Sequence, residues 1–156
     1  MSFLRVGSSR NGLGVFAKKK YIAGETILPV TGKLITCYLD DDIDEKTRDN
    51  TFRFDEERYV SPDGDAQYVN HSCEPNSKVV KKNRKLFIVA IRTIEKEEEI
   101  VFDYSTILAQ NDIWNMKCNC GSDICRGTVK RFMLLPKKIK ERYEEEKIVP
   151  EYIISL

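Results

Sequence analysis

The sequence predicts a mainly β protein, and three observations support that fold class. Short runs rich in β-branched and aromatic residues recur along the chain, for example at 26–30, 51–54 and 85–94. Glycine, proline and aspartate separate these runs, as at 62–65, where their order suits a tight turn. The length of 156 residues suits one domain with its own hydrophobic core. Together these features predict short strands arranged in small sheets.

The N-terminal part of the chain alternates strands with turns. Residues 3–9 and 15–17 read as strands on either side of Gly12 and Gly14. Because neither glycine carries a Cβ atom, backbone at this turn can approach a ligand closely. On its own a G-x-G pair is usually only a tight turn, and here a strand follows it rather than a helix. Residues 26–30 then form the next strand.

The rest of the chain continues this pattern. The acidic stretch 38–50 reads as a solvated loop or a short surface helix, since no glycine-punctuated cation loop follows it. Residues 78–91 form a predicted hairpin with a basic, solvated tip at 81–85. We expect a helical turn or more within 105–116. Residues 137–147 are dense in Lys, Glu and Arg, which suits an exposed amphipathic helix.

Composition bounds the class of protein. The chain is 41% hydrophobic and 33% charged, and no apolar run approaches the roughly 20 residues of a membrane span. Its 26 basic and 25 acidic residues nearly cancel, so direct nucleic-acid binding is not expected. Five cysteines and no secretion signal favour a reducing, intracellular setting over a disulfide framework. A nuclear or chromatin-associated location and a secreted effector both stay open, as does the oligomeric state.

The stretch 70–76 concentrates side chains that carry chemistry. It contains the only histidine, His71, together with Cys73, Asn70 and Asn76. Pro75 fixes φ and excludes a helix, so these side chains sit on an ordered loop between strands. Any one of them alone would fit a satisfied polar turn. Their combination on one loop predicts a functional site.

The cysteines predict a metal site. A C-x-C-x4-C pattern is formed by Cys118, Cys120 and Cys125. A closed structural zinc site needs four ligands, so one must come from elsewhere in the chain. Cys73 and His71 are the plausible donors, and Cys37 is the remaining thiol. Three ordinary thiols in a turn are a much weaker interpretation of so tight a spacing.

Several separated motifs agree with one known family. Residues 70–76 read N-H-S-C-E-P-N, residues 98–104 read E-E-I-V-F-D-Y, and residues 12–17 read G-L-G-V-F-A. Residues 118–127 add the cysteine pattern followed by Arg-Gly. In order and spacing these motifs resemble SET-domain protein lysine methyltransferases that carry a post-SET zinc motif. The resemblance runs from about residue 4 to about residue 130.

The resemblance implies a fold of small curved sheets with a knot-like crossing between residues 70–76, called the central loop below, and the segment of Tyr104. It also implies a division into a SET domain at 1–110, a post-SET zinc segment at 111–132 and a C-terminal helical tail at 133–156. S-adenosylmethionine is expected on one face of the crossing. The substrate lysine is expected to enter from the other face through a narrow channel.

Site residues follow from the same resemblance. Tyr104 matches the catalytic tyrosine, and Phe52 shares the substrate pocket with it. The expected cofactor contacts come from Gly12, Leu13, Gly14, Tyr68, Asn70 and His71. The expected zinc ligands are Cys73, Cys118, Cys120 and Cys125, which leaves Cys37 free and buried. Trp114 and Met116 suit either a roof over the site or core packing.

Methyl transfer to lysine suits these residue types. The reaction needs alignment and a neutral amine, whereas free lysine has a pKa of about 10.4. A desolvating, aromatic channel favours the neutral form. Two departures from the family pattern are Phe52, where many members have tyrosine, and Gln67, where arginine is common. We therefore expect an enzyme acting on a protein lysine, with a histone-like tail favoured and the number of methyl groups undetermined.

Two other functions compete with this one. A catalytically idle domain of the same fold would be a zinc-stabilised module that binds protein tails. A nucleic-acid-binding zinc protein is the weaker option, because the net charge is near zero.

Overall fold

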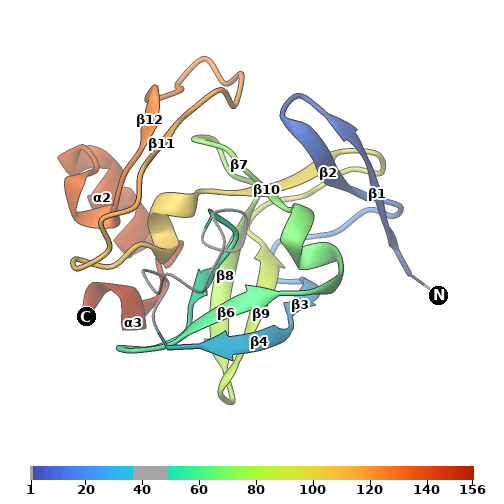
Figure 1. Ribbon diagram of the computed structural model, residues 1–156. Helices are drawn as coiled ribbons and strands as arrows, with labels where there is room; N and C mark the ends of the chain where they lie inside the picture. Colours follow the sequence, from blue (N-terminus) through green and yellow to red (C-terminus); the bar gives the residue numbers. More distant parts are fainter. Residues whose placement is uncertain (1, 37–48) are drawn as a thin grey trace.

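The computed structural model describes residues 2–36 and 49–156 and confirms the mainly β fold (Figure 1). Cys37 and most of the acidic stretch, residues 38–48, lie outside the described residues. The strands are β1 (Leu4–Ser9), β2 (Gly12–Ala17), β3 (Thr26–Val30), β4 (Gly32–Ile35), β5 (Phe52–Arg53), β6 (Tyr59–Pro62), β7 (Asn70–His71), β8 (Ser77–Lys82), β9 (Lys85–Ala90), β10 (Glu99–Phe102), β11 (Met116–Lys117) and β12 (Thr128–Val129). The helices are the 3-10 turns η1 (Gly64–Tyr68), η2 (Tyr104–Ile107) and η3 (Phe132–Leu134), then α2 (Lys137–Glu145) and α3 (Glu151–Ile154).

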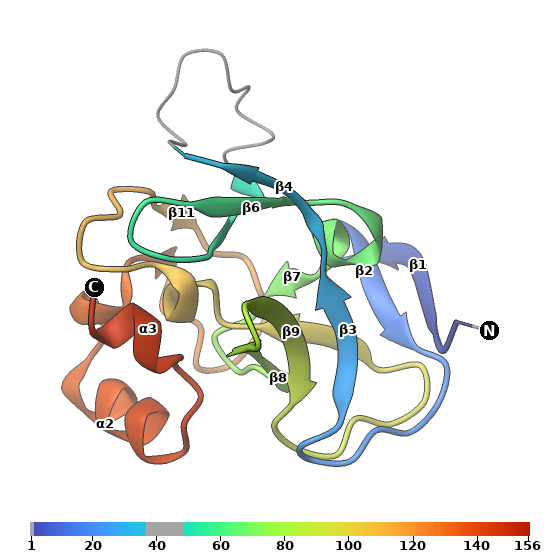
Figure 2. The same cartoon turned by 90° about the horizontal axis from the view of Figure 1, so that it is seen from below.

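Within residues 2–36 and 49–156 the strands form three sheets. The largest has the order β1-β2-β10-β8-β9-β3, and β7 pairs with β10 beside this path. A second sheet has the order β4-β6-β5, and β11 pairs with β12 alone. Both views place the C-terminal helices at the end of the molecule opposite hairpin β1–β2 (Figures 1 and 2). No helix in the described part of the chain is long and apolar enough to cross a membrane.

The predicted hairpin at 78–91 is formed by β8 and β9. Val79 and Ile88 face each other in register, and both are buried because alternate residues of each strand point into the core. The tip residues Asn83 and Arg84 have φ values of 50° and 60°. Two consecutive residues at positive φ make a turn whose twist matches the strands it joins.

The crossing expected from the family resemblance is present. Strand β10 runs parallel to both β7 and β8, with Phe102 opposite His71 on one side and Ser77 on the other. The backbone N–H of Ser72 donates to the Phe102 carbonyl at 3.1 Å, and that of Asn76 donates to the Val101 carbonyl at 3.2 Å. The loop 70–76 therefore surrounds the end of β10. Residues 103 and 104, which follow β10, begin between the two ends of this loop.

The C-terminal tail has a core of its own. Helix α2 exists as predicted, but one of its side chains, Tyr143, is completely buried, so the helix is not merely an exposed surface element. The buried members of this second core are Phe132, Leu135, Tyr143, Ile148, Val149 and Ile153. Tyr152 packs against both this cluster and the main core, so the tail is joined to the sheets by apolar contact.

Candidate active site and metal site

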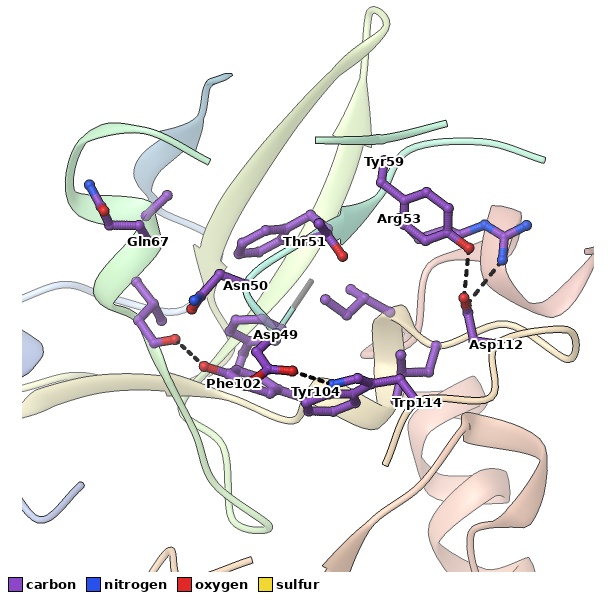
Figure 3. A pocket seen from close by; sticks show the side chains of 15 residues that line it. Asp49, Asn50, Thr51, Arg53, Tyr59, Gln67, Phe102, Tyr104, Asp112 and Trp114 are labelled. Atoms are coloured by element: carbon purple, nitrogen blue, oxygen red, sulfur yellow. Dashed lines mark hydrogen bonds and ion pairs between the residues drawn. The ribbon is translucent and has the colours of Figure 1, made fainter. Parts of the chain in front are cut away.

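A narrow cavity of about 30 Å³ lies beside the crossing (Figure 3). It is mostly apolar, and its lining residues include Phe52, Gln67, Phe102, Tyr104, Asp112 and Trp114. The aromatic rings pack in sequence, with centroid distances of 5.5 Å from Phe52 to Phe102, 4.9 Å from Phe102 to Tyr104 and 6.4 Å from Tyr104 to Trp114. Its lining offers a bound side chain a mostly apolar wall.

Three residues whose roles the sequence did not settle line this cavity. Trp114 lines it, and its indole Nε1–H donates to Asp49 Oδ1 at 2.8 Å (Figure 3). Gln67 also lines it, while its amide nitrogen donates to the Gly64 carbonyl at 2.8 Å. Phe52 is buried and presents a ring with no hydroxyl to the cavity. Met116 instead packs against the cysteine cluster.

A second, polar cleft of about 230 Å³ lies on the other side of the crossing. Its lining residues include Ser9, Arg10, Asn11, Asn70, His71 and Glu99. Asn70 organises this wall, because its side-chain nitrogen lies 3.0 Å from Ser9 Oγ, 2.8 Å from the Leu13 carbonyl and 2.9 Å from Glu99 Oε1. The cleft can therefore hold a ligand rich in hydrogen-bonding groups.

The turn that contains Gly12 and Gly14, called the glycine turn below, shapes this cleft indirectly. A side chain at Gly14 would collide with the Glu99 carboxylate, so only glycine leaves the Asn70–Glu99 contact intact. Of the expected cofactor residues, Asn70 and His71 line the cleft. Gly12, Leu13, Gly14 and Tyr68 do not line it, although the Leu13 carbonyl accepts from Asn70.

His71 and Tyr104 separate the two cavities. His71 lines the polar cleft and Tyr104 lines the aromatic cavity, and their ring centroids are 5.3 Å apart. The Tyr104 hydroxyl donates to the Val69 carbonyl at 2.7 Å (Figure 3). Burial, reinforced by the Glu99 carboxylate, raises the pKa of Tyr104 above its usual value. The group therefore stays a neutral phenol, which can donate and accept hydrogen bonds but is a poor base.

The imidazole of His71 is held neutral and in one tautomer. Its Nδ1 accepts the backbone N–H of Tyr104 at 3.0 Å, so the ring proton resides on Nε2, 3.4 Å from Cys73 Sγ. Burial lowers the pKa of His71 to about 4, against the opposing influence of Asp103. In this geometry His71 faces the cysteine cluster as a hydrogen-bond donor and not as a metal ligand.

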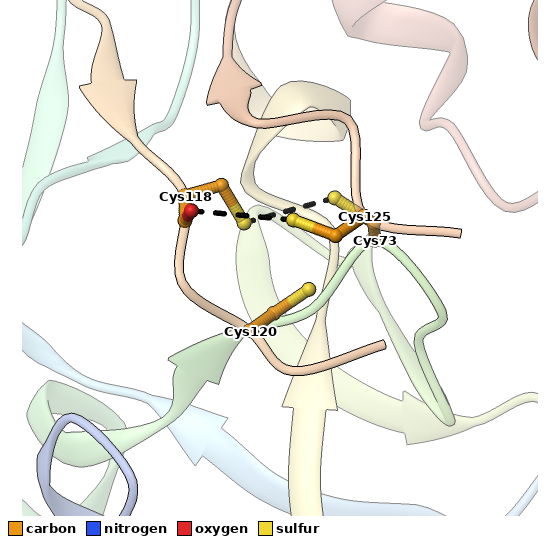
Figure 4. A group of neighbouring side chains, drawn as sticks. All are labelled: Cys73, Cys118, Cys120 and Cys125. Carbon is orange, nitrogen blue, oxygen red and sulfur yellow. Dashed lines mark hydrogen bonds between the residues drawn. The ribbon is translucent and has the colours of Figure 1, made fainter. Parts of the chain in front are cut away.

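Four thiols converge beside the polar cleft (Figure 4). The sulfur atoms of Cys73, Cys118, Cys120 and Cys125 all lie within 4.8 Å of one another. Zn–S bonds of about 2.3 Å in a tetrahedron place sulfurs about 3.8 Å apart. The Cys73–Cys118 sulfur distance is 3.8 Å. The donor set and its spacing therefore fit a structural zinc ion, and Cys73 is the residue of the loop 70–76 whose sulfur lies with the other three.

Two buried charged clusters support the site, and sequence reasoning identified neither. Asp103 is completely buried and paired with Arg126 at 2.8 Å. Arg53 and Asp112, each 1% exposed, form an ion pair of 3.0 Å at the end of the aromatic cavity (Figure 3). The Tyr59 hydroxyl donates to the same Asp112 carboxylate at 2.7 Å.

The sequence analysis also did not predict that Ser9, Arg10 and Asn11 line the polar cleft. Their position directly before the glycine turn was the signal that could have indicated it.

Comparison with known proteins assigns the family. The family model described as "SET domain" matches residues 12–105. The chain is 34% identical over 142 residues to rice (Oryza sativa subsp. japonica) histone-lysine N-methyltransferase TRX1, covering 81% of this chain and 14% of that protein. It is 35% identical over 133 residues to human histone-lysine N-methyltransferase 2B, covering 76% and 5%. The chain thus spans less than a fifth of these relatives.

Solved structures agree on the fold. A humanized mutant of the Chaetomium thermophilum Polycomb Repressive Complex 2 bound to the inhibitor GSK126 aligns with a TM-score of 0.56 and 25% identity, covering 68% of this chain and 15% of that one. KRYPTONITE in complex with mCHH DNA, H3(1–15) peptide and SAH aligns with a TM-score of 0.61 and 23% identity, covering 81% and 29%. With the family model matching well over half of its length, the chain belongs to the SET-domain family.

Proposed function

We propose that this chain transfers a methyl group from S-adenosylmethionine to the ε-amine of a protein lysine, with a histone-like tail as the favoured substrate. The observation that carries this proposal is the contact between His71 and Tyr104, whose rings are 5.3 Å apart and line different cavities. A methyl donor in the polar cleft and a lysine in the aromatic cavity would meet at that contact. The names of the relatives, which are histone-lysine N-methyltransferases, support the same chemistry.

The aromatic cavity would prepare the lysine. A free lysine is protonated at neutral pH, and an ammonium cannot accept a methyl group. The apolar lining around Phe52 and Phe102 disfavours the charged form, so the amine would release its proton to solvent water before it enters. Tyr104, whose pKa is raised by burial, then acts as a neutral phenol that orients the amine and does not remove its proton.

The polar cleft would hold the donor. S-adenosylmethionine supplies a methyl group already activated on a positive sulfonium, so the protein must chiefly align two reactants. Asn70 and His71 are the residues we assign to cofactor binding, and Glu99 offers a carboxylate in the same cleft. The backbone at Gly12, Leu13 and Gly14 keeps its assigned role only as an expectation from the family motif.

The four cysteines would bind one zinc ion with a structural role. Cys73 lies on the central loop, whereas Cys118, Cys120 and Cys125 come from the segment some forty-five residues later. Binding zinc would therefore fasten that segment to the loop that carries His71. We place the boundaries of the SET domain, the zinc segment and the helical tail at 110 and 132. We also expect a nuclear or chromatin-associated location, in keeping with the relatives' names.

The test is direct. The purified chain is incubated with S-adenosylmethionine and a panel of recombinant histones and other lysine-rich proteins, and the products are mapped by mass spectrometry. We expect methylated lysine in at least one substrate, and the same spectra report how many methyl groups are added beside Phe52. Failure to bind the cofactor in calorimetry, together with no methylated product, would leave a binding module of the same fold.

A further inference from the structure

Each of the two C-terminal helices carries one tyrosine whose hydroxyl bonds to a residue next to a wall of the aromatic cavity. The Tyr143 hydroxyl on α2 donates to Asp103 Oδ2 at 2.8 Å, and Asp103 directly precedes Tyr104. The Tyr152 hydroxyl on α3 donates to the Arg53 carbonyl at 2.7 Å, and Arg53 directly follows Phe52. Each bond therefore ends one residue away from a ring that lines the cavity. Both tyrosines lie outside residues 12–105, which the family model matches.

The first bond acts on the backbone that carries Tyr104. Asp103 precedes helix η2 at its N-cap position, and its Oδ1 accepts the backbone N–H of Ser105 at 3.0 Å. A buried carboxylate of this kind needs several donors to hold one orientation. Arg126 supplies a charged donor, and Tyr143 supplies the neutral one on Oδ2. Burial, together with the adjacent Asp103 charge, raises the pKa of Tyr143, so its hydroxyl remains a donor.

The second bond acts on the opposite wall. Strand β5 is two residues long and, among the described residues, pairs with β6 alone, so its sheet contacts are few. The Arg53 side chain anchors it from one side through Asp112. Tyr152 adds a hydrogen bond to this strand at Arg53, and the Lys81 ammonium lies 4.9 Å from the centre of the Tyr152 ring. The neighbouring Phe52 stacks on Phe102 in the cavity wall. A shift of β5 would therefore change the width of the cavity.

We propose that the hydroxyls of Tyr143 and Tyr152 are positioning groups for methyl transfer: they hold the Tyr104 wall and the Phe52 wall of the lysine cavity at a fixed separation. The inference rests on the proposed function for its consequence in the reaction, while the positioning itself is a property of the fold. In this arrangement the C-terminal helices set the geometry of the cavity without touching the substrate. Alignment of reactants is the main demand of this reaction, so a small change in wall position lowers the rate.

The experiment compares Tyr143→Phe and Tyr152→Phe with a matched control, Tyr21→Phe. Tyr21 is also an interior tyrosine, 2% exposed, and like the two test residues it does not itself line the aromatic cavity. It lies beside Lys19 and pairs with Ile94, away from the Asp103 and Arg53 positions that the two test hydroxyls reach. All variants keep their rings, so packing is preserved. Unfolding midpoint, zinc content and cofactor affinity are measured first. The values of kcat and KM follow at saturating cofactor, for a histone peptide that contains the lysine mapped by mass spectrometry. We expect kcat to fall about tenfold in each of the two variants, with cofactor affinity within about twofold of wild type.

A second readout does not depend on activity. Trp114 is the only tryptophan, and it lines the cavity 6.4 Å from Tyr104, so in variants with full zinc content its fluorescence reports on the cavity. We expect acrylamide to quench Trp114 more strongly in Tyr143→Phe and Tyr152→Phe than in wild type, and equally in Tyr21→Phe and wild type. Unchanged quenching in both variants overturns the positioning role. Altered quenching in a chain that transfers no methyl group supports positioning and rejects the proposed function instead. A loss of kcat that is just as large in Tyr21→Phe would also overturn the positioning role.

Discussion

The backbone N–H of Tyr104 donates a 3.0 Å hydrogen bond to Nδ1 of His71, a residue thirty-three positions earlier in the chain. The opposite nitrogen of the same ring lies 3.4 Å from Cys73 Sγ. One imidazole thus connects the aromatic cavity, the polar cleft and the cysteine cluster. Displacing any one of these three parts is expected to disturb the other two.

The cysteine cluster gives the first prediction. Cys120→Ser should abolish stoichiometric zinc binding and lower the midpoint of thermal unfolding by about 5 °C or more, which corresponds to roughly 2 kcal/mol in a chain of this size. Elemental mass spectrometry and calorimetry measure the two effects. Cys37→Ser is the matched control, because Cys37 is not in the predicted ligand set. Full zinc content in Cys120→Ser would contradict a four-thiolate site.

A pair of asparagines joins the zinc segment to the glycine turn. Asn11 Nδ2 donates to the Asn119 carbonyl at 3.0 Å, and Asn119 Nδ2 donates to Asn11 Oδ1 at 3.2 Å. Asn11 and Cys120 both line the polar cleft, so this pair closes one of its sides. Asn11→Ala should weaken cofactor binding about fivefold in calorimetry, as expected for one net hydrogen bond of about 1 kcal/mol.

The partner variant makes this prediction sharper. Asn119→Ala should also weaken binding, and the double variant should lose less than the two single losses combined, because both remove one shared contact. Asn115→Ala, at an exposed asparagine outside the cleft, should bind the cofactor like wild type. Fully additive losses would show that the two asparagines act separately.

The buried Arg53–Asp112 pair should be far more important for stability than a surface pair. Asp112→Asn keeps the shape but leaves the Arg53 guanidinium without its counter-charge, at a cost of about 3–5 kcal/mol in the free energy of unfolding. Glu141→Gln removes the exposed Lys137–Glu141 pair of helix α2 and should cost less than about 1 kcal/mol. Urea unfolding measures both. Equal, small losses would contradict the role assigned to the buried pair.

Glu98 should make stability depend on pH in the acid range. Burial raises the pKa of its carboxyl, but hydrogen bonds from Arg92 and Asn76 outweigh burial and hold the pKa below 4.5. The folded state therefore binds this proton less tightly than the unfolded state. The stabilisation is fully present above about pH 4.5 and is lost as the pH falls through the lower folded-state pKa. Glu98→Gln should flatten the fall in urea-unfolding free energy below pH 4.5, and an unchanged slope would contradict this.

Much of the sheet structure was predictable because its causes are local. Alternation places Val79 and Ile88 on one face of the hairpin, and the turn residues fix where the strands end. The four converging cysteines followed from spacing and from the family resemblance, although the sequence left the choice between Cys73 and His71 open. The structure favours Cys73, since its sulfur lies within 4.8 Å of the other three thiols, and His71 accepts the Tyr104 backbone N–H at Nδ1, which leaves the ring proton on Nε2.

The remaining features depend on partners that are distant in sequence. Nothing near Arg53 indicates that it is buried, because its counter-charge, Asp112, lies fifty-nine residues later. The charged composition of α2 indicated a solvated helix, yet Tyr143 reaches Asp103 from forty residues away. A pattern of single residues shows which face is apolar, but it does not show which buried polar groups will meet.

The most direct test of the central claim is single-turnover methyl transfer by Tyr104→Phe at saturating cofactor. Removing only the hydroxyl keeps the ring between His71 and Trp114. If Tyr104 aligns the amine where the two cavities meet, transfer should slow by about 100-fold, while the calorimetric affinity for S-adenosylmethionine stays within about twofold of wild type. Transfer at the wild-type rate would contradict the assignment of Tyr104 and the site built around it.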